Sequence, residues 1–239
     1  METKGLVVLS GGQDSTTCLF WAKHYYDEVH ALTFDYGQRH RIEIESAIKV
    51  AELAGVASHE IVNVEGTLKS ASPLTSNNEL ETYPDYETMD KIIGDRRELT
   101  FVPMRNALFL TIAANRAEAL GCEAIVTGVC EQDGANYSDC RSTFINAAMT
   151  FINEALGNPL SSPIKILTPL LTLTKAESIA LARKIPGCME ALAFSHTCYA
   201  GEYPPCGKCH ACVLRAQGFK EAGIADPLIT RANDEACIS

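Results

Sequence analysis

The sequence predicts an α/β protein: a doubly wound, parallel, five-stranded sheet of Rossmann-like type, followed by a C-terminal helical element. Apolar runs of strand length alternate with segments of helical periodicity, a pattern typical of parallel sheets with helices on both faces. The first run ends at a Ser-Gly-Gly turn, as expected where a buried parallel strand leads into a helix. Four cysteines crowd into residues 198–212, after the last predicted strand, and indicate the separate element.

Short apolar runs are the predicted strands. They cover residues 5–9, 29–34, 61–64, 124–129 and 164–167. Helices are expected between them, where apolar residues recur at helical spacing. One follows the Ser-Gly-Gly turn, and the others contain residues 44–51, 107–120, 143–156 and 211–222. A further helix should begin at the capping-box spacing of residues 174–177 and end at Pro186.

The chain is expected to divide at residue 185. Residues 1–185 form the α/β domain, and residues 186–239 form the four-cysteine element. Residues 66–100 are rich in Ser, Thr, Asn, Glu and Tyr with weak periodicity. A stretch of this length inside a compact domain is usually functional or disordered. We therefore expect a lid or a partly helical insertion near the active site.

The composition limits the classes of partner. The chain has 239 residues, is 46% hydrophobic, and carries a formal net charge of −10. Binding of a nucleic-acid backbone depends on clustered Lys and Arg, so we expect no nucleic-acid partner. No run of apolar residues is long enough for a membrane span, and no secretion signal opens the sequence. We therefore expect a cytoplasmic protein with small-molecule substrates.

The loop of residues 10–15, hereafter the phosphate loop, joins the first strand to the first helix. Glycine lets a backbone turn sharply and approach a ligand closely, which is the role expected of Gly11 and Gly12. Backbone N–H groups at a helix N-terminus bind phosphates, and the hydroxyls of the loop can add hydrogen bonds. Asp14 is an unusual neighbour for phosphates unless it coordinates Mg²⁺. The loop lacks the Lys of a Walker A motif and does not match Gly-x-Gly-x-x-Gly.

Four of the ten cysteines, Cys198, Cys206, Cys209 and Cys212, form the cysteine cluster. Four thiolates fill the tetrahedral shell of a structural zinc ion. An iron–sulfur cluster uses similar Cys-x2-Cys steps and is the main alternative. A redox Cys-x-x-Cys pair would leave the other cysteines unexplained. His196 and His210 lie beside a shell that is already full, so we favour zinc with these four ligands.

The phosphate loop, Ser-Gly-Gly-Gln-Asp-Ser at residues 10–15 after a first strand, resembles the signature of the PP-loop (N-type) ATP pyrophosphatases. The resemblance implies an adenine nucleotide α-hydrolase-like fold, and cleavage of ATP between the α- and β-phosphates to adenylate a substrate oxygen. It implies ATP contacts at Leu9, Ser10, Gly11, Gly12, Gln13, Asp14, Ser15, Thr16, Thr17, Cys18 and Leu19. Catalytic roles are expected for Asp14, Ser15, Arg105 and Lys175. Lys175 opens a helix, where a cation is unfavourable unless it meets an anion such as phosphate.

Further strings, in order, resemble a narrower family, the 7-cyano-7-deazaguanine synthases of queuosine precursor synthesis. They are residues 36–40, 102–106, 168–170, 173–177 and 196–199, with the cysteine cluster. The resemblance implies that ATP adenylates the carboxylate of 7-carboxy-7-deazaguanine and that ammonia then forms the amide. A second ATP activates the amide oxygen, and loss of AMP leaves the nitrile. A homodimer is implied by the same resemblance.

Residues 133–141 follow the family's usual string only in part, because Ala135, Asn136 and Ser138 replace its Ser, Gly and Pro. The polar side chains that persist are candidate substrate contacts. With two residues after the second strand, the candidates are Arg39, His40, Asp133, Tyr137, Asp139 and Arg141. Simpler alternatives stay open: Asp139 and Asn106 can cap helices, Arg141 can lie in solvent, and Arg39 and His40 can be exposed loop charges.

Two other functions are compatible with the phosphate loop. A tRNA-modifying relative would adenylate a base for lysidine formation or thiolation, although the acidic balance speaks against it. A nucleotide-sensing zinc module would bind ATP without turnover.

Overall fold

The computed structural model describes residues 2–39, 41–131, 136–159 and 162–238. Its sheet has five parallel strands in the order β3-β2-β1-β4-β5, which confirms the predicted fold class. The strands are β1 (Lys4–Val8), β2 (Glu28–Asp35), β3 (Ser58–Asn63), β4 (Ala124–Val126) and β5 (Lys165–Leu167). β1 lies at the centre, where Gly5 is opposite Val29 on β2 and Ala124 on β4.

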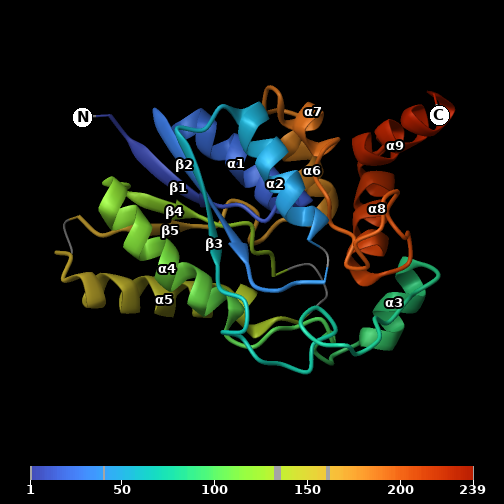
Figure 1. The fold of residues 1–239 in the computed structure, drawn as a ribbon, viewed down its shortest axis with the longest axis horizontal. Helices are drawn as coiled ribbons and strands as arrows, with labels where there is room; N and C mark the ends of the chain where they lie inside the picture. The colour runs from blue at the N-terminus through green and yellow to red at the C-terminus, as the bar shows by residue number, and fades with distance from the viewer. Residues whose placement is uncertain (1, 40, 132–135, 160–161, 239) are drawn as a thin grey trace.

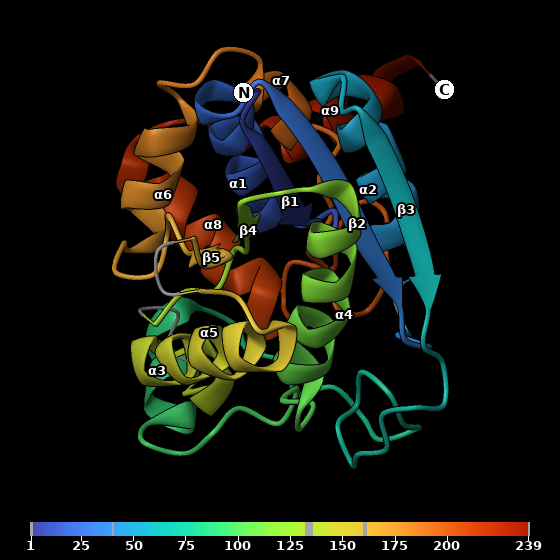
Figure 2. The same cartoon turned by 90° about the vertical axis from the view of Figure 1, so that its left-hand side faces the viewer.

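Helices cover both faces of the sheet (Figure 1 and Figure 2). The helices of the described residues are α1 (Gln13–Tyr25), α2 (Ile42–Ala54), α3 (Tyr86–Ile93), α4 (Arg105–Leu120), α5 (Ser142–Leu156), α6 (Lys175–Ala182), α7 (Cys188–Leu192), α8 (His210–Ala222) and α9 (Pro227–Ile238), of which α3, α8 and α9 lie to one side of the sheet. The alternation along β1 explains the two layers, because successive side chains point to opposite faces. Val7 packs in the core with α1, α2 and α7, whereas Leu6 packs in the core with α4 and α5.

Several element bounds differ from those predicted. β3 begins at Ser58, before the predicted residue 61, because its exposed edge residues carry no apolar signal. β4 ends at Val126 rather than residue 129, and α6 ends at Ala182, ahead of Pro186. The Thr174–Glu177 capping box is present, as the sequence predicts. α2 and α4 end at left-handed caps, Gly55 and Gly121, the residue type that this backbone conformation favours.

The insertion of residues 66–100 is docked on the C-terminal element. Its helix α3 lies beside α8 in Figure 1. Tyr83, Met89 and Ile93 form a buried cluster with Val213 and Leu214 of α8, and the Tyr83 backbone N–H donates to the Lys208 carbonyl at 2.7 Å. This packing ties the insertion to the segment that carries the cysteine cluster.

The predicted boundary at residue 185 does not separate two packing units cleanly. Cys188, Ala191 and Leu192 of α7 are fully buried in the same core cluster as α1 and α2. α8 and α9 then extend the chain beyond this core (Figure 1). The division into 1–185 and 186–239 therefore stays a prediction. Among the described helices, none combines the length and the apolarity that crossing a bilayer requires.

Candidate active site

A cavity of about 500 Å³ opens at the carboxyl ends of the central strands. Its wall includes the phosphate loop after β1, Phe34 and Tyr36 at the end of β2, and Thr127 to Val129 after β4. From β1 the chain adds β2 and β3 on one side and then returns to add β4 on the other side of β1. This is the topological switch point, where doubly wound sheets bind their ligands.

The phosphate loop is held in shape by its own hydroxyls. Ser10 N donates to Ser15 Oγ at 3.2 Å, and the two serine Oγ atoms lie 3.0 Å apart. Ser15 Oγ in turn donates to the Gly12 carbonyl at 3.1 Å. α1 begins directly afterwards, at Gln13, so the N-terminus of this helix opens onto the cavity. This arrangement offers backbone N–H groups and a helix dipole to an anion.

The side chains of residues 16–19, in the far part of the predicted ATP-binding string, point into the protein. The side chains of Thr16, Thr17, Cys18 and Leu19 are buried and do not line the cavity. Thr16 Oγ1 donates to the Gly12 carbonyl at 2.8 Å, and Thr17 Oγ1 donates to the Gln13 carbonyl at 3.0 Å. Because these groups are used inside α1, we restrict the predicted ATP contacts of side chains to residues that line the cavity.

The missing side chain of Gly11 allows the phosphate loop to pack closely against α2. The residue has a φ of +90°, and a Cβ there would lie 2.6 Å from Ala47 N and even closer to the Glu43 carbonyl oxygen. Gly12, by contrast, lines the cavity and has an extended backbone. The close approach that the missing Cβ of Gly11 permits is therefore between the loop and α2, and the predicted ATP contacts of Gly11 and Gly12 stay predictions.

Replacing Gly11 by alanine is expected to lower the free energy of unfolding by several kcal/mol, because backbone strain adds to a backbone clash. Gly55→Ala is the matched control. Gly55 has a φ of +60°, and a Cβ there would meet no other atom within 4 Å, so only the conformational cost of about 1–2 kcal/mol applies. Urea unfolding measures both. Equal effects of the two substitutions would contradict the packing role of Gly11.

Lys175 and Asp14 form an ion pair across the mouth of the phosphate loop. Lys175 Nζ lies 2.8 Å from Asp14 Oδ2, and the lysine side chain is 10% exposed. Both residues line the cavity. Gly218 of α8 makes room for the lysine stem, since a Cβ at that position would lie 2.9 Å from Lys175 Cβ. Lys175 opens α6, where a cation is expected to meet an anion such as phosphate. In the structure this anion is the carboxylate of Asp14, in the loop where phosphates would bind.

Arg105 is the second cation of the cavity and lies at the start of α4. Its Nη1 donates to the Tyr36 hydroxyl at 3.4 Å, and no carboxylate among the described residues forms an ion pair with it. Burial alone lowers the pKa of Arg105. The larger combined effect of Tyr36, Tyr137, Tyr199 and Asp139 raises this pKa above its ordinary value, so the guanidinium stays charged. A half-buried cation without an ion-pair partner is costly. Arg105 is therefore well placed to receive an anionic ligand.

Asp139 caps a helix, although not the one that follows it in sequence. Asp139 Oδ2 accepts a hydrogen bond from the backbone N–H of Asn106, in the first turn of α4, at 3.3 Å. Asn106 Nδ2 donates back to the Asp139 carbonyl at 3.1 Å. Asn106 thus lies inside α4 and is not its N-cap, which is Met104. Burial raises the pKa of Asp139 above its ordinary value, and Arg105 partly offsets this rise.

The other predicted substrate contacts fall in different places. Tyr137 and Arg141 line the cavity. Arg39 does not line it: its Nη2 donates to the carbonyls of Asn78 at 3.1 Å and Ser76 at 3.4 Å, which attaches the second strand's loop to the insertion. His40 and Asp133 lie outside the described residues.

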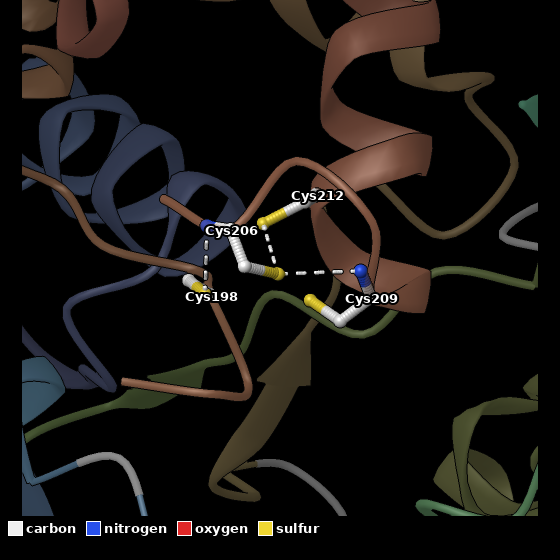
Figure 3. Close-up of side chains that lie close together, drawn as sticks. All are labelled: Cys198, Cys206, Cys209 and Cys212. Atoms are coloured by element: carbon white, nitrogen blue, oxygen red, sulfur yellow. Dashed lines mark hydrogen bonds between the residues drawn. The ribbon is translucent and has the colours of Figure 1, made fainter. Parts of the chain in front are cut away.

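The cysteine cluster brings its four Sγ atoms within 4.8 Å of one another (Figure 3). Cys206 Sγ and Cys212 Sγ are 3.9 Å apart, close to the roughly 3.8 Å that Zn–S bonds of about 2.3 Å give in a tetrahedron. The backbone N–H groups of Cys206 and Cys209 donate to the sulfurs of Cys198 and Cys206 at 3.4 and 3.3 Å. Hydrogen bonds from neighbouring thiols lower the pKa of Cys198, which favours a thiolate. The donor set fits a closed tetrahedral metal site.

Sequence reasoning missed several residues of the cavity wall. Tyr36 and Gly128 follow strands, and the rule that ligands bind at strand ends would have found them. A Cβ at Gly128 would lie 3.0 Å from the backbone of Asp14 and Ser15, so this glycine lets the end of β4 approach the phosphate loop. Tyr199 and His210 each follow a cysteine of the cluster and line the cavity. The metal site and the cavity therefore share one wall.

Comparison with known proteins adds the family. A family model described as queuosine biosynthesis protein QueC matches residues 4–223. The 7-cyano-7-deazaguanine synthase of Gloeobacter violaceus is 50% identical over 94% of this chain and 95% of its own length. That of Laribacter hongkongensis is 48% identical over 95% of this chain and 94% of its own. Among solved structures, a 4-thiouridine synthetase–RNA complex with bound ATP has a TM-score of 0.50 at 18% identity, covering 99% of this chain and 54% of that one.

Proposed function

The chain belongs to the QueC family of queuosine biosynthesis proteins, and on this premise we propose that it converts 7-carboxy-7-deazaguanine and ammonia to 7-cyano-7-deazaguanine at the expense of ATP. The observation that carries the proposal is one cavity that joins a phosphate loop to Arg105, a cation with no ion-pair partner among the described residues. Relatives about half identical over nearly their full length are named as synthases of this nitrile. They favour the small-molecule reaction over the tRNA-modifying alternative.

The first step is adenylation of the substrate carboxylate. A carboxylate oxygen attacks the α-phosphorus of ATP, a new P–O bond forms, and the bond to the β-phosphate oxygen breaks to release pyrophosphate. The phosphate loop and Lys175 would hold the leaving pyrophosphate, which their shared place on the cavity wall supports. Asp14 would hold Mg²⁺, which supplies charge neutralisation on the phosphates. The ion pair keeps Lys175 beside the loop, so its charge is already in place when the phosphates bind.

Ammonia then attacks the acyl carbon, and AMP leaves with one former carboxylate oxygen to give the amide. The amide oxygen attacks a second ATP in the same way. Loss of AMP and a proton from the adenylated amide forms the nitrile. Each nitrile therefore consumes two ATP and yields two AMP and two pyrophosphates, and both oxygens of the carboxylate end in AMP.

The substrate end of the cavity is proposed to be the wall formed by Arg105, Tyr137 and Arg141. The Arg105 guanidinium can form paired hydrogen bonds with a carboxylate, which would orient the attacking oxygen. Tyr137 is positioned to contact the deazapurine. Asp139 acts on Arg105 and α4 from behind this wall, because its carboxylate binds Asn106 N. Roles for His40 and Asp133 stay predictions.

We further propose one structural zinc ion per subunit in the cysteine cluster, held by Cys198, Cys206, Cys209 and Cys212. Because Tyr199 and His210 adjoin two of these cysteines, the ion would fix one wall of the cavity. The proposal also includes a cytoplasmic location and a homodimer, which the family resemblance implies. The net charge of −10 supports the absence of a nucleic-acid partner. Sedimentation of the holoprotein with and without tRNA measures both the subunit number and nucleic-acid binding.

Turnover by the purified, metal-replete protein tests the reaction. With ATP, Mg²⁺, ammonium and 7-carboxy-7-deazaguanine, mass detection should find the nitrile with two AMP for each nitrile. Formation of ADP and phosphate would contradict adenylation. Release of AMP only when tRNA is added would favour the tRNA-modifying alternative, and tight ATP binding with no release of pyrophosphate would favour a nucleotide sensor.

A further inference from the structure

Glu98 is a buried carboxyl group that the reaction above does not use. It lies at the end of the insertion and is 2% exposed. Its Oε2 accepts hydrogen bonds from the Thr100 backbone N–H at 2.6 Å and from the Thr100 hydroxyl. The Tyr137 hydroxyl lies 2.5 Å from Thr100 Oγ1 and 3.3 Å from Glu98 Oε2. A short chain of groups thus leads from the insertion to a residue of the cavity wall.

The chemistry of these groups determines which of them donates each hydrogen bond. An ionised carboxylate only accepts hydrogen bonds, and each hydroxyl has one proton to donate. Thr100 donates its proton to Glu98, so the contact between Thr100 Oγ1 and the Tyr137 hydroxyl must be donated by Tyr137. Burial and the nearby Glu98 charge raise the pKa of Tyr137, which keeps this proton on the phenol. The Tyr137 oxygen therefore has lone pairs, and no proton, left for another partner.

We propose that Glu98 is a positioning residue which, both directly and through Thr100, makes the Tyr137 hydroxyl a hydrogen-bond acceptor for N–H groups of the substrate. The inference rests on the proposed function, because a deazaguanine carries such donors at its ring N–H and its 2-amino group. If the Tyr137 hydroxyl proton pointed into the cavity, it would meet the N–H protons of the 2-amino group, and no hydrogen bond could form. Glu98 thus selects bases with an amino group at this edge, although it does not touch them.

Two variants test the hydrogen bonds among Glu98, Thr100 and Tyr137. Glu98→Leu removes the oxygen that accepts from Thr100 and lies 3.3 Å from the Tyr137 hydroxyl, which frees the phenol proton to turn to the cavity. Thr100→Val removes only the relay hydroxyl, and the Tyr137 hydroxyl can then still donate to Glu98 Oε2 directly. Glu87→Leu is the matched control, since Glu87 is an exposed carboxylate in the same insertion.

Calorimetry on the zinc-loaded protein with a non-hydrolysable ATP analogue provides the test. The ligands are 7-carboxy-7-deazaguanine and its analogue without the 2-amino group. The unaltered protein, Glu87→Leu and Thr100→Val should prefer the amino compound. Glu98→Leu and Tyr137→Phe should each reduce this preference about tenfold, the effect of one hydrogen bond. Affinity for the ATP analogue should not change.

The double variant Glu98→Leu/Tyr137→Phe should be no worse than Tyr137→Phe alone, because Glu98 acts through that hydroxyl. Independent, additive losses would overturn the inference, as would an unchanged preference in Glu98→Leu. If Glu98→Leu fails to fold, Glu98→Met, which fills more of the same space without an oxygen acceptor, decides the matter. If the unaltered protein binds neither compound, the proposed function itself is wrong, a result distinct from failure of the role of Glu98.

Discussion

Replacement of Arg105 by alanine is expected to lower kcat/KM for 7-carboxy-7-deazaguanine by roughly 100- to 1,000-fold, the usual effect of removing one pre-positioned charge-stabilising group. Arg105 lines the cavity, its guanidinium donates to the Tyr36 hydroxyl at 3.4 Å, and it forms no ion pair with any carboxylate in the part of the chain that the structure describes. Its charge is therefore available to an anion on the ligand. Steady-state kinetics with each substrate varied in turn would show for which substrate kcat/KM falls.

Two further variants separate charge from geometry at this position. Arg105→Lys keeps the charge without the planar fork, so it should recover only part of the activity. Arg183→Ala removes an exposed arginine of the same protein and should leave kcat/KM unchanged. Full activity of Arg105→Ala, with zinc content and melting temperature preserved, would show that the cavity recognises its anion without this residue.

Loss of the metal is the second large effect expected. Structural zinc sites contribute about 10–16 kcal/mol to folding of small domains, which is comparable with the whole stability of a typical protein. Cys209→Ser should therefore lose one equivalent of metal and lower the melting temperature by about 10 °C or more, since each kcal/mol shifts it by roughly 2–4 °C at this size. Thermal unfolding combined with elemental analysis measures both quantities.

Cys237→Ser is the control for this substitution, because Cys237 is exposed and lies outside the cluster. It should keep both the metal and the melting temperature. Iron and sulfide in place of zinc in the unaltered protein would refute the zinc assignment. A Cys209→Ser protein with a full equivalent of zinc would show that the four sulfurs do not form one metal shell.

The sequence was informative wherever structure depends on neighbouring residues. The central strand, the turn into α1, the left-handed caps at Gly55 and Gly121 and the capping box at Thr174 are all set by local patterns. The cysteine cluster was equally readable, since its ligands lie within residues 198–212. The parallel sheet followed from alternation of strands and helices alone.

Contacts between distant segments were not readable in this way. The packing of Gly11 on α2, the attachment of Arg39 to the insertion and the capping of α4 by Asp139 each depend on a partner many residues away. The buried Glu98 lies in a polar stretch whose composition suggested a lid. Only the fold shows that this stretch brings a carboxylate to Thr100 and Tyr137.

Isotope tracing tests the central claim, that ATP activates the oxygens of a deazapurine carboxylate. Substrate with both carboxylate oxygens replaced by ¹⁸O would be turned over with unlabelled ATP and ammonium, and the products analysed by mass spectrometry. Each nitrile should be accompanied by two AMP molecules, each with one ¹⁸O atom. Unlabelled AMP, or label found in inorganic phosphate beside ADP, would contradict adenylation of the carboxylate and of the amide.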